Sequence, residues 1–408
     1  MVDNHNCEVI IVGGGIGGLA TALFLARLGL KSHILERKKE RSEDGAGIQI
    51  GPNGTRILND LGILESLRPF AGVPRALKAF HGQTGKIIGT LPLGKWMDER
   101  FEYPYWVLHR VDLHRILFEA VRDEPLISIT MDARVLEVTS QPQHEGGVSV
   151  TTQQGHTWHA WVAIGADGIW SQVRAHVLEN EPDDISPAFT GKSAVRTVVP
   201  MSKLPPMILR DCVSLWMAPN AHLVHYPIRG GRELAVVVVL NDGKAIESWS
   251  SPVDVSWVLG GMAGFHQSAR LLVASGENWR VWGLHTFPRL PTWVRGCVAL
   301  LGDAAHPILP FLAQGAVMAL EDAAVLAESL KDSVSNEGKL NRSRVSAALR
   351  AYQTRRRARV FRVQERSMWQ GKIYHMKGGM ARARDCALRF SPPKGLMAGY
   401  DWLYGWVK

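Results

Sequence analysis

The chain has 408 residues, 46% of them hydrophobic and 21% charged, with a formal net charge of +9 at pH 7. This composition excludes disordered and fibrous proteins, and the length favours two interlocked domains. The positive charge favours anionic partners such as dinucleotides, small carboxylates or nucleic acid. The four cysteines are scattered without metal-ligand spacing, which predicts reduced, mostly buried thiols, a cytoplasmic protein and no metal site. No apolar run approaches the roughly 20 residues of a membrane span.

The N-terminal segment combines a predicted strand, residues 8–12, with a glycine-rich turn and a helix. Three glycines follow the strand in G-x-G-x-x-G spacing: Gly13, Gly15 and Gly18. In such a motif the first glycine makes a tight turn, the second admits a pyrophosphate to the backbone, and the third lets helix and strand pack closely. A second strand, residues 32–35, leads to Glu36, which can bind ribose hydroxyls. The pattern predicts dinucleotide binding, and the alternative is a simple glycine-rich turn.

The next segments supply a glycine-rich extended stretch, residues 44–53, and a predicted helix, residues 55–67. A strand over 105–109 then leads to Arg110 and to a helix for which Asp112 is the expected N-cap. An arginine at such a strand–helix junction suits the pyrophosphate or sugar region of a dinucleotide. A surface arginine is the alternative.

A further buried strand, residues 161–164, runs into Gly165, Ala166, Asp167 and Gly168. Arg174 follows shortly after this turn. The chain has no second G-x-G-x-x-G motif, which disfavours a separate nicotinamide-dinucleotide domain.

From about residue 191 to residue 286 the sequence favours strands, with a hairpin turn at 229–232. We expect a mostly antiparallel sheet that forms one wall of a closed pocket. On one of these strands His222, Val224 and Tyr226 share a face, because strand side chains alternate. His222 and Tyr226 are therefore the best polar pair for binding a substrate phenol. The alternative is a satisfied core histidine beside a packed tyrosine.

The segment 302–322 links a buried strand, residues 298–301, to a helix that begins near Gly315 and Ala316. Asp303 leaves the strand end, where a carboxylate can bind sugar hydroxyls. The helix start offers unpaired N–H groups and a positive dipole end for an anionic ring edge. A flavin requires both features, whereas the alternative is an ordinary strand–loop–helix connection. We expect His306 to hold its loop in place rather than to act as a catalyst.

The C-terminal region is predicted to be helical and basic over residues 345–374, and the tail, residues 400–406, is expected to pack on the body. Five arginines near one another would suit nucleic acid: Arg355, Arg356, Arg357, Arg359 and Arg362. They fall on all sides of the helix rather than forming one stripe, and no aromatic platform interleaves them. We therefore predict no nucleic-acid binding and interpret the helix as solvated or as facing a second subunit, which would make a homodimer.

The sequence GDAAHPILPFLAQGAVMALED, residues 302–322, resembles the GD motif of single-component FAD-dependent aromatic hydroxylases. The group that it resembles most contains salicylate, 6-hydroxynicotinate and 3-hydroxybenzoate hydroxylases. In that family the motif aspartate contacts the ribityl chain and the Gly-Ala helix start faces the isoalloxazine. Asp167 and Gly168 match the family's DG motif, which lies near the pyrophosphate and the route used by the nicotinamide cofactor, so the resemblance makes Asp167 and Arg174 the candidates there. The family also places an arginine at the position of Arg110. One departure is Pro310, where the 3-hydroxybenzoate hydroxylase pattern has glutamine, and this leaves the position of hydroxylation open.

The resemblance implies an α/β protein of the para-hydroxybenzoate hydroxylase fold, in which a Rossmann-type FAD domain is interlocked with a mostly antiparallel substrate domain and followed by a helical C-terminus. The expected boundaries are 1–75, 100–180 and 290–330 for the FAD domain, 76–99 and 181–289 for the substrate domain, and 331–408 for the C-terminal region.

The implied activity is hydroxylation of a small phenolic aromatic acid, of hydroxybenzoate or hydroxypyridine carboxylate type, through a flavin 4a-hydroperoxide. FAD is the expected cofactor, NADH or NADPH and molecular oxygen are co-substrates, and His222 and Tyr226 are the expected catalytic residues. The loop around Pro310 and Phe311 would exclude water. The alternatives are a flavin-dependent reductase or dehydrogenase on the same fold, and a non-catalytic basic module that carries flavin.

Overall fold

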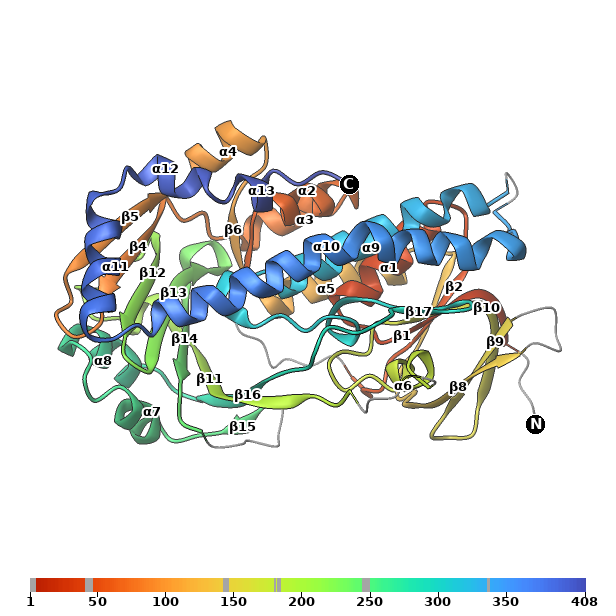
Figure 1. The fold of residues 1–408 in the computed structure, drawn as a ribbon, viewed down its shortest axis with the longest axis horizontal. Coiled ribbons are helices and arrows are strands. Elements are labelled where there is room, and N and C mark those ends of the chain that lie inside the picture. The colour runs from red at the N-terminus through yellow and green to blue at the C-terminus, as the bar shows by residue number, and fades with distance from the viewer. Residues whose placement is uncertain are drawn as a thin grey trace.

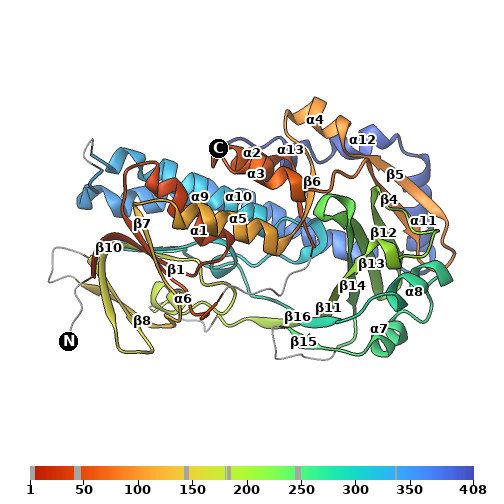
Figure 2. The same ribbon diagram turned by 180° about the vertical axis from the view of Figure 1, so that it is seen from behind.

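Two eight-stranded sheets, joined by a small two-stranded ribbon, organise the chain (Figure 1). The computed structural model describes residues 5–40, 47–141, 147–179, 181, 185–243, 250–335 and 338–408. We call the two sheets the parallel sheet and the antiparallel sheet. The long helix α10 (Arg342–Tyr374) runs across both of them, as Figures 1 and 2 show from opposite sides.

The parallel sheet forms around β1, an apolar strand whose residues Val9 to Ile11 are fully buried. Its main path runs in the order β17 (Val294–Arg295), β18 (Val298–Leu300), β10 (Thr157–Gly165), β1 (His5–Val12), β2 (Ser32–Leu35) and β7 (Ile127–Thr130). The central pairs are parallel, and β8 (Val135–Gln141) with β9 (Gly147–Thr152) extends β10 in antiparallel fashion. The carboxyl ends of the parallel strands therefore meet at one edge.

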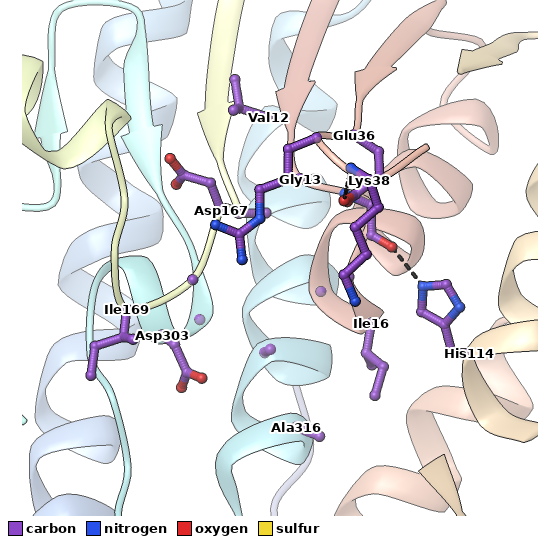
Figure 3. A pocket seen from close by; sticks show the side chains of 18 of the residues that line it. Val12, Gly13, Ile16, Glu36, Lys38, His114, Asp167, Ile169, Asp303 and Ala316 are labelled. Carbon is purple, nitrogen blue, oxygen red and sulfur yellow. Dashed lines mark hydrogen bonds between the residues drawn. The ribbon is translucent and has the colours of Figure 1, made fainter. Parts of the chain in front are cut away.

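Four helices cover this sheet: α1 (Ile16–Ala26), α5 (Arg110–Arg122), α6 (Val173–Val177) and α9 (Gly315–Leu330). Of these, α1 and α9 are the most deeply buried. Helix α1 packs against both α5 and α9, and α10 packs on the outside of α9. This layering places the N-termini of α1, α5 and α9 at the edge where the parallel strands end (Figure 3).

The antiparallel sheet runs in the order β15 (Ser251–Pro252), β16 (Arg280–Thr286), β11 (Ala188–Pro200), β14 (Glu233–Leu240), β13 (Ala221–Ile228), β12 (Cys212–Ala218), β4 (Ala76–His81) and β5 (Ile87–Pro92). Only the β4–β12 pair is parallel. One face carries a core with α7 (Val255–Gly261) and α8 (Gln267–Ala274), and the other face packs against Phe311 and Tyr374. The expected mostly antiparallel sheet is confirmed.

Short elements join the sheets and close the fold. The ribbon pairs β3 (Gly47–Ile50) with β6 (Trp106–His109), and the remaining helices are α2 (Pro52–Asp60), α3 (Leu64–Leu67), α4 (Lys95–Phe101), α11 (Gly378–Phe390), α12 (Pro393–Ala398) and α13 (Asp401–Tyr404). The chain end returns to α2, as Figure 1 shows, and buries Leu403 and Tyr404, so the expected packing of the tail is confirmed. Within the described residues no helix is both long and apolar enough to cross a membrane.

Several local expectations were wrong. The helix expected over 55–67 is two helices, α2 and α3, because Gly62 lies between them with a φ of +69°. Asp112 does not cap α5. The N-cap is His109, whose Nδ1 accepts a hydrogen bond from the Val111 N–H, and Asp112 instead pairs with Arg229 at 3.1 Å.

The four cysteines are unpaired as expected, but only Cys212 is buried, and Cys386 is exposed. The expectation of mostly buried thiols was therefore wrong. Part of the stretch 44–53 lies outside the described residues. Its described part forms β3 and the start of α2.

The interpretation of α10 as solvated holds for its exposed side, which carries Arg355, but not for the side that buries part of its charge. Arg356 is 1% exposed and donates hydrogen bonds to Asp322 and Glu321, both at 2.7 Å. Arg359 also donates to Glu321, at 2.6 Å, so one carboxylate of α9 receives two arginines from α10. Burying these charges requires close pairing, which fixes α10 on α9.

Candidate active site

A cavity of about 550 Å³ opens at the carboxyl edge of the parallel sheet. We call it the main cavity, and Figure 3 shows around it side chains from α5 and from the segments that follow β2, β10 and β18. Eight of the nine predicted cofactor residues line it: Gly13, Gly15, Glu36, Arg110, Asp167, Asp303, Gly315 and Ala316. The ninth, Gly18, lies behind the lining.

A side chain would have a different steric effect at each of the three motif glycines. Gly13 has a φ of +108°, and a Cβ there would lie 2.5 Å from the Ala166 carbonyl oxygen. A Cβ on Gly18 would lie 2.0 Å from the Gly13 carbonyl oxygen, so this glycine permits the contact between turn and helix. A Cβ on Gly15 would meet no atom within 4 Å, because Gly15 faces the main cavity. The open space over Gly15, beside a helix N-terminus, fits a pyrophosphate.

Glu36 has its carboxylate fixed by the turn. Its two oxygens accept hydrogen bonds from the Gly14 N–H at 2.7 Å and from the Lys38 N–H at 2.9 Å. Each oxygen has a further lone pair for a ribose hydroxyl. His114, which the sequence analysis did not identify, holds the same turn through a bond of 2.8 Å between Nε2 and the Gly14 carbonyl oxygen (Figure 3). Burial lowers the pKa of His114.

Arg110 and Asp303 bring opposite charges to the main cavity. Both side chains are exposed to the open cavity, but protein atoms crowd around them from the other sides, and this is the burial to which their pKa values respond. Burial raises the pKa of Asp303, and the nearby His306 and Arg110 oppose this effect. Burial lowers the pKa of Arg110, and Asp303 opposes it. A cation and a carboxylate in one crevice suit a ligand with both a pyrophosphate and sugar-like hydroxyls.

The loop that carries Asp303 is anchored from behind. Gly302 has a φ of +60°, and its N–H donates to Asp322 Oδ2 at 3.1 Å. His306 Nε2 lies 2.5 Å from the same oxygen, and Arg356 holds the other oxygen of Asp322. His306 therefore does hold its loop, as expected. The pKa of Asp322 is about 2, because His306 and Arg356 outweigh the effect of its burial.

Asp167 and Arg174 have structural partners. Asp167 Oδ2 accepts from the Gln172 N–H at 2.8 Å and from the Val173 N–H at 3.3 Å, and so stabilises the start of α6. Arg174 is buried, donates to the Ile169 and Ala304 carbonyls, and does not line the main cavity. Burial raises the pKa of Asp167.

His222 and Tyr226 lie together on β13 but not on the lining of the main cavity. Each is 3% exposed. The ring of His222 lies 5.7 Å from that of Phe311, and the preceding residue, Pro310, lines the main cavity. Tyr226 lies against the backbone of Gly47, and the next residue, Ile48, also lines this cavity. Both side chains thus pack on residues that neighbour lining residues in the sequence, and neither lines the cavity itself.

His222 has a partner that the sequence analysis did not identify. Its Nδ1 lies 2.8 Å from Nε2 of His375, the residue at the end of α10. Burial and the neighbouring His375 hold the pKa of His222 well below its usual value, so the ring is neutral at pH 7. No local pattern pointed to His375, because it is 153 residues away along the chain.

Three features together define a flavin-binding oxidoreductase: a glycine turn, an acid at the next strand end, and a loop with a carboxylate at the start of another helix. The comparison with known proteins agrees. Residues 6–367 match a family described as "FAD binding domain". The chain belongs to the family of FAD-dependent aromatic hydroxylases, and it is a monooxygenase that uses FAD and NAD(P)H.

Two curated relatives illustrate the match. The chain is 36% identical over 405 residues to 3-hydroxybenzoate 6-hydroxylase 1 of Aquipseudomonas alcaligenes, covering 98% of each chain. It is 31% identical over 407 residues to 3-amino-4-hydroxybenzoate 2-monooxygenase of Streptomyces cremeus, covering 99% of this chain and 96% of the relative.

Solved structures agree in fold. A salicylate hydroxylase substrate complex matches with a TM-score of 0.81 and 26% identity, covering 98% of this chain and 96% of that chain. Klebsiella pneumoniae HpxO, complexed with FAD and uric acid, matches with a TM-score of 0.82 and 24% identity, covering 96% and 95%. The predicted hydroxylase fold is confirmed.

Proposed function

We propose that this monooxygenase hydroxylates a small phenolic aromatic acid of the hydroxybenzoate or hydroxypyridine carboxylate type. Relatives that match nearly their whole length support the substrate class, since their names specify 3-hydroxybenzoate and 3-amino-4-hydroxybenzoate. A relative named 6-hydroxynicotinate 3-monooxygenase, from Pseudomonas fluorescens, is 30% identical over 371 residues, covering 89% of this chain and 91% of the relative. The ring position that is hydroxylated stays open.

The cofactor assignments support this reaction. Gly13 and Gly15 would receive the FAD pyrophosphate, with Gly18 behind them holding the turn against the helix, and Glu36 would bind the adenosine ribose. The remaining contacts, to the pyrophosphate, the ribityl chain and the flavin ring, would be made by a second group of residues: Arg110, Asp167, Asp303, Gly315 and Ala316. The first-turn N–H groups of α9 have no partners within the helix, so they can stabilise negative charge at the ring edge. When bound, FAD supplies hydride acceptance and oxygen activation.

The burial of His222 as a neutral ring near Phe311, the residue next to the lining residue Pro310, is the observation that carries the catalytic assignment. With Nδ1 engaged by His375, Nε2 is the nitrogen that would accept the proton of the substrate phenol. A more electron-rich ring is attacked more readily. Tyr226 would orient the phenol, and the apolar surroundings of Phe311 would exclude water.

The test compares two neighbouring histidines. His222→Ala should still oxidise NAD(P)H when an aromatic acid is present, but most of the oxygen should leave as hydrogen peroxide. General-base catalysis contributes about 10²–10⁴-fold, so hydroxylated product should fall far more than NAD(P)H consumption. His225→Ala is the matched control, because His225 is equally buried on the opposite face of β13 and pairs with Trp216. It should keep its coupling.

Product, NAD(P)H consumed and trapped peroxide are measured over a panel of hydroxybenzoates and hydroxypyridine carboxylates. Wild-type coupling in His222→Ala would return this residue to a structural role. NAD(P)H oxidation without any hydroxylated product in the wild type would favour the alternative, a reductase.

We also propose a cytoplasmic location, which the four unpaired cysteines support. A homodimer stays a prediction. The absence of nucleic-acid binding also stays a prediction, supported by the engagement of Arg356 and Arg359 with carboxylates of α9.

A further inference from the structure

A second cavity, of about 530 Å³, adjoins the main cavity through the side chain of Arg196, which lines both. It lies where β11 leaves its pairing with β16. Its other lining residues come from the end of β11, the segment before β16, and His109 at the end of β6. None of them has a role in the cofactor or substrate assignments above.

Two arginines face each other at this cavity. Arg196 and Arg280 are direct register partners in the antiparallel pair of β11 and β16, so their side chains project from the same face. Like charges directly opposite each other destabilise a sheet. The guanidinium of Arg196 lies 4.5 Å from the centroid of the Trp282 ring, and Trp282 lines the main cavity. Arg280 donates to the Ser250 carbonyl at 3.3 Å.

Lys203 adds a third cation to the lining. The one carboxylate among the lining residues, Glu277, lies 2.8 Å from the Lys203 ammonium. Both side chains are more than half exposed, at 53% and 70%, so this pair is weak and can rearrange around a ligand. The lining thus has a positive excess, with hydroxyl groups of Thr197 and Ser275 beside it. This combination suits phosphate oxygens.

We propose that the second cavity binds the phosphate-bearing part of NAD(P)H, with its nicotinamide directed past Arg196 towards the main cavity. The enzyme consumes this dinucleotide, yet the sequence has a single G-x-G-x-x-G motif, and that motif lines the main cavity. The co-substrate therefore needs another anion site within reach of the flavin. The shared Arg196 puts the second cavity in that position. The inference rests on NAD(P)H use and not on the assignment of the aromatic substrate.

The FAD-loaded enzyme is titrated with NAD⁺ and NADP⁺, which bind without reducing the flavin, in a calorimeter at low ionic strength. Arg280→Gln and Lys203→Gln should each weaken binding about tenfold or more, the effect of one lost charge-assisted contact. Lys86→Gln is the matched control. It removes one exposed charge from the turn between β4 and β5 of the same sheet and should leave binding unchanged.

Anaerobic stopped-flow reduction by NADH and NADPH should give the same increase in Kd. FAD content, aromatic acid binding and the reaction of dithionite-reduced enzyme with oxygen should be unchanged, which separates this inference from the proposed function. Weaker binding of both dinucleotides would place the pyrophosphate in the second cavity. Weaker binding of NADP⁺ alone would place the 2′-phosphate there. If both variants bind NAD⁺ and NADP⁺ as the wild type does, the inference is overturned.

Discussion

The parallel sheet and the antiparallel sheet present their functional residues in opposite ways. At the parallel sheet, Gly15, Glu36 and Asp303 line an open cavity, and each sits at a strand end or helix start. At the antiparallel sheet, His222 and Tyr226 are buried among side chains from distant parts of the chain. The first surface is ready to receive a large ligand, whereas the second has to open by at least one layer of side chains.

This difference follows from where each site obtains its polar partners. The cofactor loops satisfy their own backbone groups, as Glu36 does for Gly14 and Lys38. The polar groups of the antiparallel sheet depend on tertiary neighbours, as His222 depends on His375. A buried polar group without such a partner would cost free energy. Both sides therefore depend on the C-terminal helix, the substrate side through His375 and the Asp303 loop through Arg356 and Asp322. The glycine turn of the cofactor side is sensitive to backbone sterics as well.

The largest expected effect is at Gly15. Gly15→Val should abolish FAD retention without unfolding the protein, since its new side chain would enter the main cavity and meet no protein atom within 4 Å of its Cβ. Purified protein should be colourless, with a wild-type thermal transition for the FAD-free form.

Gly18→Ala is the contrasting variant. Its Cβ would lie 2.0 Å from a backbone oxygen, so the turn has to shift, and the apoprotein should lose about 1–3 kcal/mol of stability or more. If Gly15→Val keeps its full FAD content, the pyrophosphate binds elsewhere. If Gly15→Val unfolds the apoprotein, the new side chain does collide with protein atoms.

Much of the parallel sheet was predictable because its signals are local. Strand β2, helix α9 and the loop around Asp303 follow from short apolar runs and from glycines within a few residues. The misassigned cap of α5 shows the limit, since a tertiary partner, Arg229, takes the carboxylate of Asp112. The burial of Arg356 was not predictable either, because its carboxylates lie on another helix. The same holds for His375.

The buried charge network between α9 and α10 should give the next largest effect. Arg356→Leu would leave Asp322 and Glu321 with fewer partners in the interior, and breaking such a pair costs about 3–5 kcal/mol. Because Asp322 also holds Gly302 and His306, FAD binding should weaken as well. Chemical denaturation and flavin titration measure the two effects.

Arg355→Leu, one residue earlier on the exposed side of α10, is the control and should change stability little. Equal stability of the two variants would mean that the network does not hold the helices together.

A smaller effect is expected at Asp303. Asp303→Ala should weaken FAD retention and slow flavin reduction, because the ribityl hydroxyls would lose a charged acceptor, a contribution of about 1.5–3 kcal/mol. The protein should remain partly yellow. Asp303→Asn should recover part of the binding, since an amide oxygen can still accept a hydrogen bond. Unchanged flavin content and reduction rate in both variants would make Asp303 a structural residue only.

The smallest effect concerns acid stability of the antiparallel sheet. Burial lowers the pKa of His225 to about 3, and burial with a smaller contribution from Lys192 lowers that of His375 to about 4. His222 is shifted in the same direction. Below the usual histidine pKa of about 6.5 these histidines bind protons in the unfolded chain but stay neutral in the folded protein. The free energy of unfolding therefore falls as pH falls. Asp322, with its pKa of about 2, does not take part in this range, because its unfolded value is near 4.

Replacing one such ring should therefore flatten the pH dependence of unfolding. Between pH 7 and pH 5 the buried His222 should account for part of the loss, because its folded-state pKa is held well below the usual value, and one proton changes stability by at most about 1.4 kcal/mol per pH unit. His222→Phe would remove that share, whereas His156→Phe, at an exposed turn beside the parallel sheet, would not. Urea unfolding of the apoprotein at both pH values measures it. An equal loss in wild type and His222→Phe would show that His222 becomes protonated in the folded state, and a charged ring at rest could not accept the phenol proton.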